Sequence, residues 1–323
     1  MRLRLVPEQT NIDFFRWQSL TLGVSAVAMV LSLVAWLTLG LNFGIDFQGG
    51  TTIRTESSQS VDVGAYRDAL APLNLGDVSI TEVFDPTFGE DQNVAMIRVQ
   101  AQADQEAVGS QTVMAIEAAL QAVDPSITFP SVESVGPKVS GELIWTAIMA
   151  VAASLVAILF YIWLRFEWQF SVGAVAALFH DVLLTIGIFS VLQIRFDLAT
   201  IAALLTIIGY SINDTVVIFD RLRENLIKFK VMPLRDLMNL TVNETLSRTL
   251  MTSGTTLIAL IAMLVLGGDV IRGFVFAITW GIVVGTYSSV YVAKNIVLLL
   301  GVKRDWTKVN DGKAGTQFGN IDA

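Results

Sequence analysis

Cysteine is absent from this sequence of 323 residues, and histidine occurs once, as His180. Without cysteine the chain can form no disulfide, bind no metal through thiolates and use no thiol nucleophile. A single histidine also excludes a metal site built from several histidines. Because the sequence contains no G-x-S-x-G motif, nucleotide-binding glycine loop or cluster of metal ligands, an enzyme is the least favoured class, and we expect no cofactor and no metal.

Charge is also scarce, since charged residues make up 15% of the chain and hydrophobic residues 53%. This composition is too apolar for a soluble globular protein and indicates a polytopic α-helical membrane protein. Six apolar runs are long enough to cross a bilayer as helices. They cover residues 19–41, 143–164, 170–192, 198–219, 246–266 and 273–300.

The first of these runs could instead be a secretory signal, because Arg2, Arg4 and Arg16 precede it. However, no A-x-A cleavage pattern follows its uncharged stretch. We therefore interpret residues 19–41 as a retained transmembrane helix.

Lysine and arginine are divided unequally between the two sides of the predicted helices. If the N-terminus is cytoplasmic, the cytoplasmic segments hold 15 of the 21 basic residues, and the short loops opposite hold only Arg195 and Arg272. The positive-inside rule then predicts that both termini are cytoplasmic. The predicted segments are a cytoplasmic N-terminus (1–18), the first helix (19–41), a periplasmic domain (42–141), a bundle of five helices (142–300) with a cytoplasmic loop (220–247), and a cytoplasmic tail (301–323).

The periplasmic domain is acidic, with 15 acidic against 4 basic residues from Asp46 to Glu142. Its apolar patterns predict an α+β, ferredoxin-like βαββαβ order. The expected elements are strand 51–55, helix 61–70, strand 78–84, strand 94–100, helix 105–122 and strand 128–135. The acidic surface favours solubility, and steering of a nearby chain is the alternative.

Residues with special backbone properties join this domain to the membrane part. Gly49 and Gly50 follow the first helix, and Gly136 and Pro137 precede the second. We interpret these residues as hinges, and the alternative is a pair of fixed turns.

The segment from Asp220 to Arg248 is amphipathic. It predicts a helical hairpin that lies against the inner membrane surface. A plain positively charged anchor is the alternative interpretation.

Asp214 is the only charged residue between Leu198 and Phe219. A helix over this run would rise about 33 Å, which matches a hydrocarbon core of about 30 Å. An ionised carboxylate at that depth costs about 2.5 to 3.5 kcal/mol, so Asp214 must be paired, solvated or protonated. We interpret Asp214 as a proton carrier on a polar helical face with Asn213, and the alternative is an acid that only fixes helix packing.

Three other polar residues fall within the predicted helices. His180 and Asp181 lie near the middle of the third helix, where His180 could relay protons or could be a packed hydrogen-bond donor. Arg248 lies near the inner end of the fifth helix, at a depth that could match Asp214. Movement that makes and breaks an Asp214–Arg248 pair would load and unload a proton, whereas an Arg248 side chain that snorkels to the surface would not.

Several motifs together resemble the SecD/SecF family of Sec translocase accessory subunits, in particular its SecF branch, within the resistance-nodulation-division superfamily. The likeness covers all six predicted helices and the domain between the first two. The motifs are residues 44–50 (GIDFQGG), 135–137 (VGP), 165–168 (RFEW), 177–182 (ALFHDV), 209–225 (GYSINDTVVIFDRLREN) and 246–249 (LSRT).

This resemblance implies a complex with SecD and proton-driven export of unfolded polypeptides through SecYEG, with YajC and YidC as further partners. It implies that Asp214 and Arg248 carry the proton step. It implies the bacterial inner membrane as the location, membrane lipid as the surroundings and no nucleic-acid partner. A proton-coupled exporter of small molecules or lipids from the same superfamily is the alternative function, against which the single small outer domain argues. A structural scaffold would not need Asp214, Asp181 and Arg248 at depth.

Overall fold

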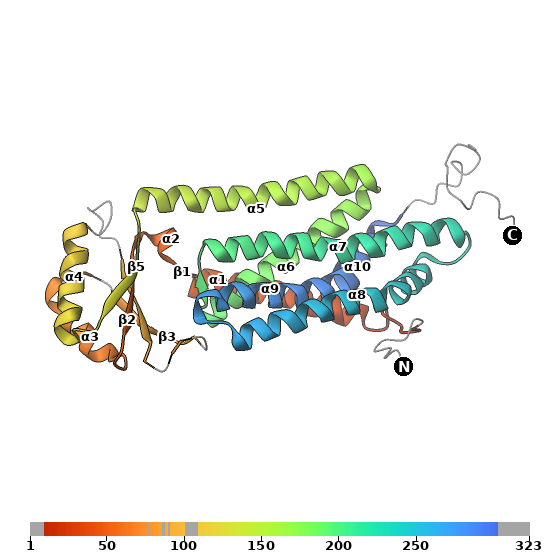
Figure 1. Ribbon diagram of the computed structural model, residues 1–323. Coiled ribbons are helices and arrows are strands. Elements are labelled where there is room, and N and C mark those ends of the chain that lie inside the picture. The colour runs from red at the N-terminus through yellow and green to blue at the C-terminus, as the bar shows by residue number, and fades with distance from the viewer. Residues whose placement is uncertain (1–9, 77, 86–87, 90, 101–108, 303–323) are drawn as a thin grey trace, which may run out of the picture.

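A computed structural model describes residues 10–302 except 77, 86–87, 90 and 101–108. Its described part contains six helices that are long and apolar enough to cross a membrane, as predicted. These helices form a bundle, and a smaller α/β domain lies at one end of it (Figure 1). They are α1 (Gln18–Leu39), α5 (Pro137–Arg165), α6 (Trp168–Leu192), α7 (Leu198–Lys228), α8 (Leu234–Leu266), and α9 (Asp269–Ser288) continued by the π-helical turn η2 (Ser289–Ala293) and α10 (Lys294–Leu300).

Two apolar clusters hold the bundle together. The cluster nearer the α/β domain includes Phe189 and Ile207, and the cluster at the opposite end includes Phe219 and Leu237. Glycine allows α9 and α7 to approach closely, because a Cβ atom at Gly281 of α9 would lie 2.3 Å from Ile207 Cγ1 of α7. The helices can therefore bring polar side chains within hydrogen-bond distance.

Residues 220–247, interpreted from the sequence as a cytoplasmic loop that forms a helical hairpin, consist of the ends of two long helices and the turn between them. Helix α7 continues to Lys228 and α8 begins at Leu234, so only residues 229–233 form a turn. The helices continue because Leu222, Leu226 and Leu237 are buried in the apolar cluster between them. The same amphipathic pattern would fit a membrane surface, which is why the sequence suggested one.

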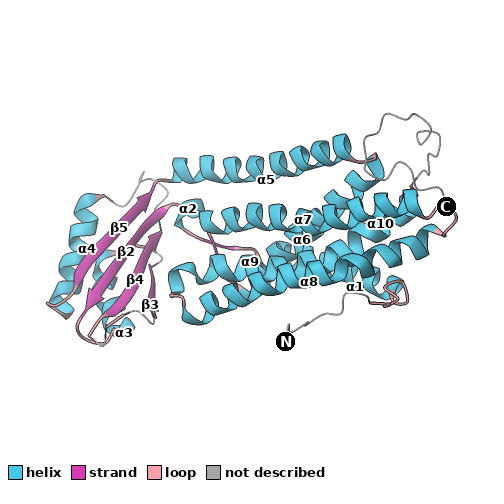
Figure 2. Ribbon diagram, turned by 45° about the vertical axis from the view of Figure 1, so that its right-hand side comes forward, coloured by secondary structure: helices cyan, strands magenta, loops and turns pink. Residues whose placement is uncertain are grey.

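The α/β domain has the chain order β2-α3-β3-β4-α4-β5. Its sheet has the strand order β3-β4-β2-β5 with antiparallel neighbours, and α3 and α4 cover one face of it (Figure 2). Fully buried Ile53, Ile97, Ile116 and Leu120 form the core between sheet and helices. The elements are β2 (Gly50–Ser57), α3 (Val63–Leu70), the 3₁₀ turn η1 (Ala71–Leu73), β3 (Val78–Val83), β4 (Asn93–Gln100), α4 (Ser110–Val123) and β5 (Thr128–Val135). Residues 105–108 of the predicted second helix lie outside the described residues.

A short junction connects this domain to the bundle. Strand β1 (Asn42–Phe43) pairs in parallel with β6 (Arg195–Phe196), and the short helix α2 (Ile45–Gln48) follows β1. Arg195 Nη1 also lies 3.9 Å from the Met96 sulfur of β4. Burial, and next the charge of nearby Arg195, lower the pKa of Arg98 to about 10. The sheet face that carries Arg98 therefore lies against the bundle.

Candidate functional site

Asp214 lies in the interior of the bundle on α7. The side chain of Asp197 caps the start of this helix by accepting a hydrogen bond from Thr200 N, one of the N–H groups that a helix start leaves unpaired. Asp214 is only 4% exposed. Ser253 Oγ of α8 donates to Asp214 Oδ2 at 3.5 Å, at the outer limit of a hydrogen bond. Ser253 Oγ also lies 2.8 Å from Thr286 Oγ1 of α9, so Asp214 shares this hydroxyl with a shorter contact.

Arg248 and Asn213, which the sequence predicted to act with Asp214, are not in contact with it. Both side chains are exposed on the bundle surface, on α8 and α7. Within the described part of the chain, Arg248 forms no ion pair or hydrogen bond through its side chain. Arg248 is nevertheless near enough for its charge to interact with Asp214. Arg248 thus lies near the buried acid but not in contact with it, and without an ion pair among the described residues.

Asp181 of α6 forms a second and denser polar cluster. His180 Nδ1 lies 2.9 Å from Asp181 Oδ1, Ser211 Oγ of α7 donates to Oδ2 at 2.6 Å, and Ser288 Oγ of α9 donates to Oδ2 at 2.8 Å. Asp181 is 1% exposed. Its carboxylate thus connects three helices through short hydrogen bonds.

A hydrogen on His180 Nδ1 fits this contact, because a carboxylate oxygen of Asp181 can accept it. This ring is also buried and packs nearly parallel to the ring of Tyr287, at 6.2 Å between centroids. Its Nε2 atom has no hydrogen-bond partner among the described residues. Tyr287 in turn bonds to α1 through Ser25 Oγ at 3.0 Å.

The sequence did not indicate which residues complete these clusters. Gly285 makes room for the cluster at Asp181, because a Cβ atom there would lie 3.0 Å from Ser211 Cβ. Ser211 precedes Asp214 by three residues, so both project from neighbouring positions on α7. The spacing of Gly281 and Gly285 on α9 was the available signal, since small residues four apart allow helices in membranes to approach closely.

The predicted hinge residues lie next to one another in space. Gly50 pairs with Val135 in the sheet, which brings Gly49 and Gly50 beside Gly136. Gly49 has φ 75° and Gly50 has φ 135°, a backbone region that favours glycine. Pro137 is at the first position of α5, where a missing N–H costs nothing. Both connections to the α/β domain therefore pass through one place.

No group of three or more metal-ligating side chains occurs among the described residues. Among the described residues, the interior of the bundle offers two buried acids, one imidazole, one amine (Lys294) and several hydroxyl and amide groups.

Known proteins resemble the whole chain. A model of the C-terminal region of the protein export membrane proteins SecD and SecF matches residues 115–303, and a model of the SecD/SecF GG motif matches residues 34–61. A protein translocase subunit SecF from Cereibacter sphaeroides is 70% identical over 322 residues, which cover 100% of this chain and 99% of that protein. Another from Rhodobacter capsulatus is 66% identical over 313 residues, covering 95% of this chain and 94% of its own.

Solved structures agree with these sequences. The crystal structure of SecDF, a translocon-associated membrane protein from Thermus thermophilus, matches with a TM-score of 0.80 at 35% identity. The match covers 93% of this chain but only 40% of the SecDF chain. A second structure, of SecDF in a super-membrane-facing form, matches with a TM-score of 0.65 at 37% identity over 92% of this chain and 39% of that one.

Proposed function

Since the chain belongs to the SecD/SecF family of protein export membrane proteins, on its SecF branch, we propose that it couples proton flow to protein export through Asp214. The family makes it a translocase accessory subunit. The proton-coupled step, its residues and its direction are the proposal.

One observation supports Asp214 most strongly. Asp214 is buried on a membrane-spanning helix, and its only hydrogen bond in the described part of the chain is the long one to Ser253. An ionised carboxylate in hydrocarbon needs several donors or a counter-ion, whereas a protonated one needs few. The site therefore suits an acid that changes protonation state rather than one that stays charged.

Arg248 supplies the second part of the proposed mechanism. If the side chain of Arg248 turns inward, its guanidinium neutralises the ionised carboxylate of Asp214, and if it turns outward, Asp214 binds a proton instead. Each proton moving down the membrane potential delivers about 2.3 kcal/mol per 100 mV. This energy shifts a two-state equilibrium about 50-fold, enough to bias a conformational change.

We assign Asp181 and His180 a different role in this proposal. Because Asp181 receives hydrogen bonds from α6, α7 and α9, it holds α7 at a fixed rotation beside α9. Asp214 lies one helical turn after Ser211 on α7, so the bond from Ser211 to Asp181 also positions Asp214.

The proposed orientation follows the distribution of basic residues. The α/β domain lies in the periplasm, and both termini lie in the cytoplasm of a cell with this chain in its inner membrane. The sheet order fits the ferredoxin-like arrangement expected from the sequence. We propose that this domain moves as a unit about Gly49, Gly50, Gly136 and Pro137.

We further propose SecD as the partner within the membrane. The chain spans about 40% of the SecDF structure it resembles, which leaves room there for a second membrane part. Exposed polar side chains on α7 and α8 also need a cover other than lipid. They are Thr206, Asn213, Arg248 and Thr255. SecYEG, YajC and YidC, and unfolded exported polypeptides, are the proposed contacts beyond SecD.

The test is gradient-dependent export by membrane vesicles that carry Asp214→Asn. Asparagine keeps the size and the hydrogen bonding of the side chain but cannot titrate, so we expect normal assembly and loss of the response to the gradient. Export must be measured after ATP-driven steps are complete, with and without a proton gradient. Asp220→Asn is the matched control, because Asp220 lies on the same helix, is half-exposed and pairs with Arg165. Equal gradient responses in both variants would refute the proposal.

A further inference from the structure

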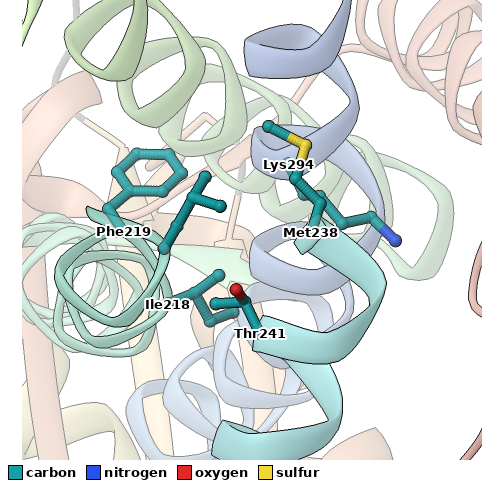
Figure 3. Close-up of a pocket in the computed structure, with 6 residues that line it drawn as sticks. Ile218, Phe219, Met238, Thr241 and Lys294 are labelled. Atoms are coloured by element: carbon teal, nitrogen blue, oxygen red, sulfur yellow. The ribbon is translucent and has the colours of Figure 1, made fainter. Parts of the chain in front are cut away.

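Lys294 is a buried amine that the proposed mechanism does not use. It is the first residue of α10, directly after the π-helical turn η2, and is 1% exposed. Its Nζ atom has no hydrogen-bond partner among the described residues. Figure 3 shows Lys294 with Met238 and Thr241 of α8 around a narrow gap, which admits no water molecule. A charged amine in such a place lacks its usual hydration.

Aromatic rings cover this amine from the N-terminal side. The Nζ atom lies 3.9 Å from the ring centroid of Phe15, 5.5 Å from that of Phe14 and 5.7 Å from that of Tyr291. Phe14 and Phe15 are 7% and 2% exposed. Ring faces attract a cation, but they replace only part of the hydration of an ammonium group.

The segment that carries these phenylalanines is held to α8 by two asparagines one helical turn apart. Asn239 Oδ1 accepts from Phe14 N at 2.9 Å, and Asn243 Oδ1 accepts from Ile12 N at 2.8 Å. Both asparagines also donate to the carbonyl of Ile12, at 3.0 and 2.9 Å. One of these four bonds, from Asn239 to the carbonyl of Ile12, is exposed, and the other three are part-buried. On α8 they use only the side chains of the two asparagines, so they can exchange for bonds to water while the backbone bonds of the helix stay intact.

We propose that residues 10–16 form a removable cap over Lys294, and that Lys294 gains a proton when the cap opens and loses it when the cap closes. In the open state water hydrates the ammonium group, and its new N–H bond is made with a proton taken from that water. In the closed state the proton returns to water before the rings of Phe14 and Phe15 close over the amine. If the proposed function holds, the cap closes the cytoplasmic end of the bundle. The capping of Lys294 does not depend on the proposed function.

Among the residues that the structure describes, few other charged groups act on the amine. Asp13 of the cap and Arg235 of α8 act on Lys294 with opposite signs, and Tyr291 is the titratable neighbour on its own helix. The α7 side chains that line the gap are apolar, namely Ile218, Phe219 and Leu222. Hydration, rather than a counter-ion, is therefore the main change that opening brings to Lys294.

The test is amide hydrogen exchange of residues 10–16 in the full chain, compared between wild type, Lys294→Met and Lys294→Arg. Methionine cannot be protonated, so in Lys294→Met no hydrated ammonium group stabilises the open state. Amide exchange at Ile12 and Phe14 should therefore slow by about tenfold relative to wild type, because these amides exchange only when the cap opens. Arginine stays protonated, so exchange should become faster than in wild type. The exchange rate of wild type divided by that of Lys294→Met should fall as pH rises, because the amine of Lys294 then gains fewer protons when the cap opens.

A permanently charged Lys294 that only anchors the cap would give the opposite sign, since Lys294→Met would then loosen the segment. That result, or equal exchange in all three proteins, would overturn the proposal. If Lys294→Met fails to fold, a second measurement decides. In Asn239→Ala/Asn243→Ala, a water-soluble amine-reactive ester should label Lys294 about tenfold faster than in wild type. Exposed Lys228 serves as the internal reference, and unchanged labelling of Lys294 relative to it would also overturn the proposal.

Neither measurement uses export or a proton gradient. A failure of the proton role of Asp214 would therefore leave these results unchanged, and a failed cap would leave the test of Asp214 intact.

Discussion

Two acids lie inside the bundle, and the helices surround them in opposite ways. Asp181 receives hydrogen bonds from His180, Ser211 and Ser288, all at 2.9 Å or less. Asp214, on the next helix along the chain, has one contact with Ser253 at 3.5 Å. Both are nearly inaccessible to solvent, at 1% and 4% exposure.

We propose that this difference separates an acid that fixes helix packing from an acid that carries protons. A carboxylate with several short hydrogen bonds is stabilised in one state, and removing it leaves its partners unsatisfied. A carboxylate with few bonds can change its protonation state at little cost to its neighbours. Burial is similar for both acids, so our proposal that Asp214 carries the proton depends on the number of donors around each acid.

The largest expected effect on stability is at Asp181. Asp181→Ala should lower the free energy of unfolding by about 3 kcal/mol, because His180, Ser211 and Ser288 lose their shared acceptor in the interior. Denaturant titration of the purified protein in lipid nanodiscs measures this change. Asp220→Ala, which breaks a half-exposed pair, should cost about 1 kcal/mol or less. Equal losses in the two variants would remove the distinction between the acids.

A smaller effect is expected at the glycine that makes room for Asp181. Gly285→Ala should destabilise the bundle by about 1 kcal/mol, since the new Cβ presses on Ser211. Gly254→Ala of α8 is the control, because a Cβ atom there has no neighbour within 4 Å and alanine favours a helix. The effect of Gly285→Ala should be largely lost in an Asp181→Ala background and retained with Asp214→Asn. Additive losses with Asp181→Ala would show that the glycine acts independently of this cluster.

Asp124 of the α/β domain shows how several hydrogen bonds to a carboxylate change its pKa. Its carboxylate accepts hydrogen bonds from the side chain of Ser57 and from the backbone and side chain of Ser126. The Ser57 bond, followed by the Ser126 backbone bond, lowers the pKa of Asp124 below its usual value. The stability this contributes is present above the unfolded-state pKa and is lost as pH falls through the lower folded pKa.

Ser57→Ala should therefore make the domain unfold at a higher pH on acidification. Hydrogen exchange of β5 during an acid titration reports this unfolding. Ser58→Ala is a nearby exposed control whose side chain does not bond to Asp124. An unchanged acid midpoint in Ser57→Ala would mean that these bonds do not stabilise the charged form.

The sequence predicted some of these features for clear physical reasons. Long uncharged runs predict membrane helices because the bilayer admits little else, and six such helices are present. The lone charge between Leu198 and Phe219 pointed to Asp214 for the same reason. The extension of α7 and α8 was missed, because buried Leu222 and Leu237 have the same pattern as residues on a membrane surface.

The partners of Asp181 could not be predicted in the same way. Ser211 and Ser288 are 77 residues apart, and nothing local shows that both meet Asp181. Serine and glycine also occur in many helices for packing alone. The contrast between the two acids thus depends on knowing which helices are neighbours, which is a property of the fold.

The central claim is tested most directly by proton uptake into liposomes that contain this chain reconstituted with SecD, under an imposed gradient. We compare Asp214→Asn with Asp181→Asn, in which the amide oxygen can still accept the two serine hydrogen bonds of the cluster. The account predicts that Asp214→Asn abolishes uptake while Asp181→Asn retains it. Uptake that survives in Asp214→Asn and is lost in an intact Asp181→Asn complex would contradict it, and would assign the proton to Asp181 and His180.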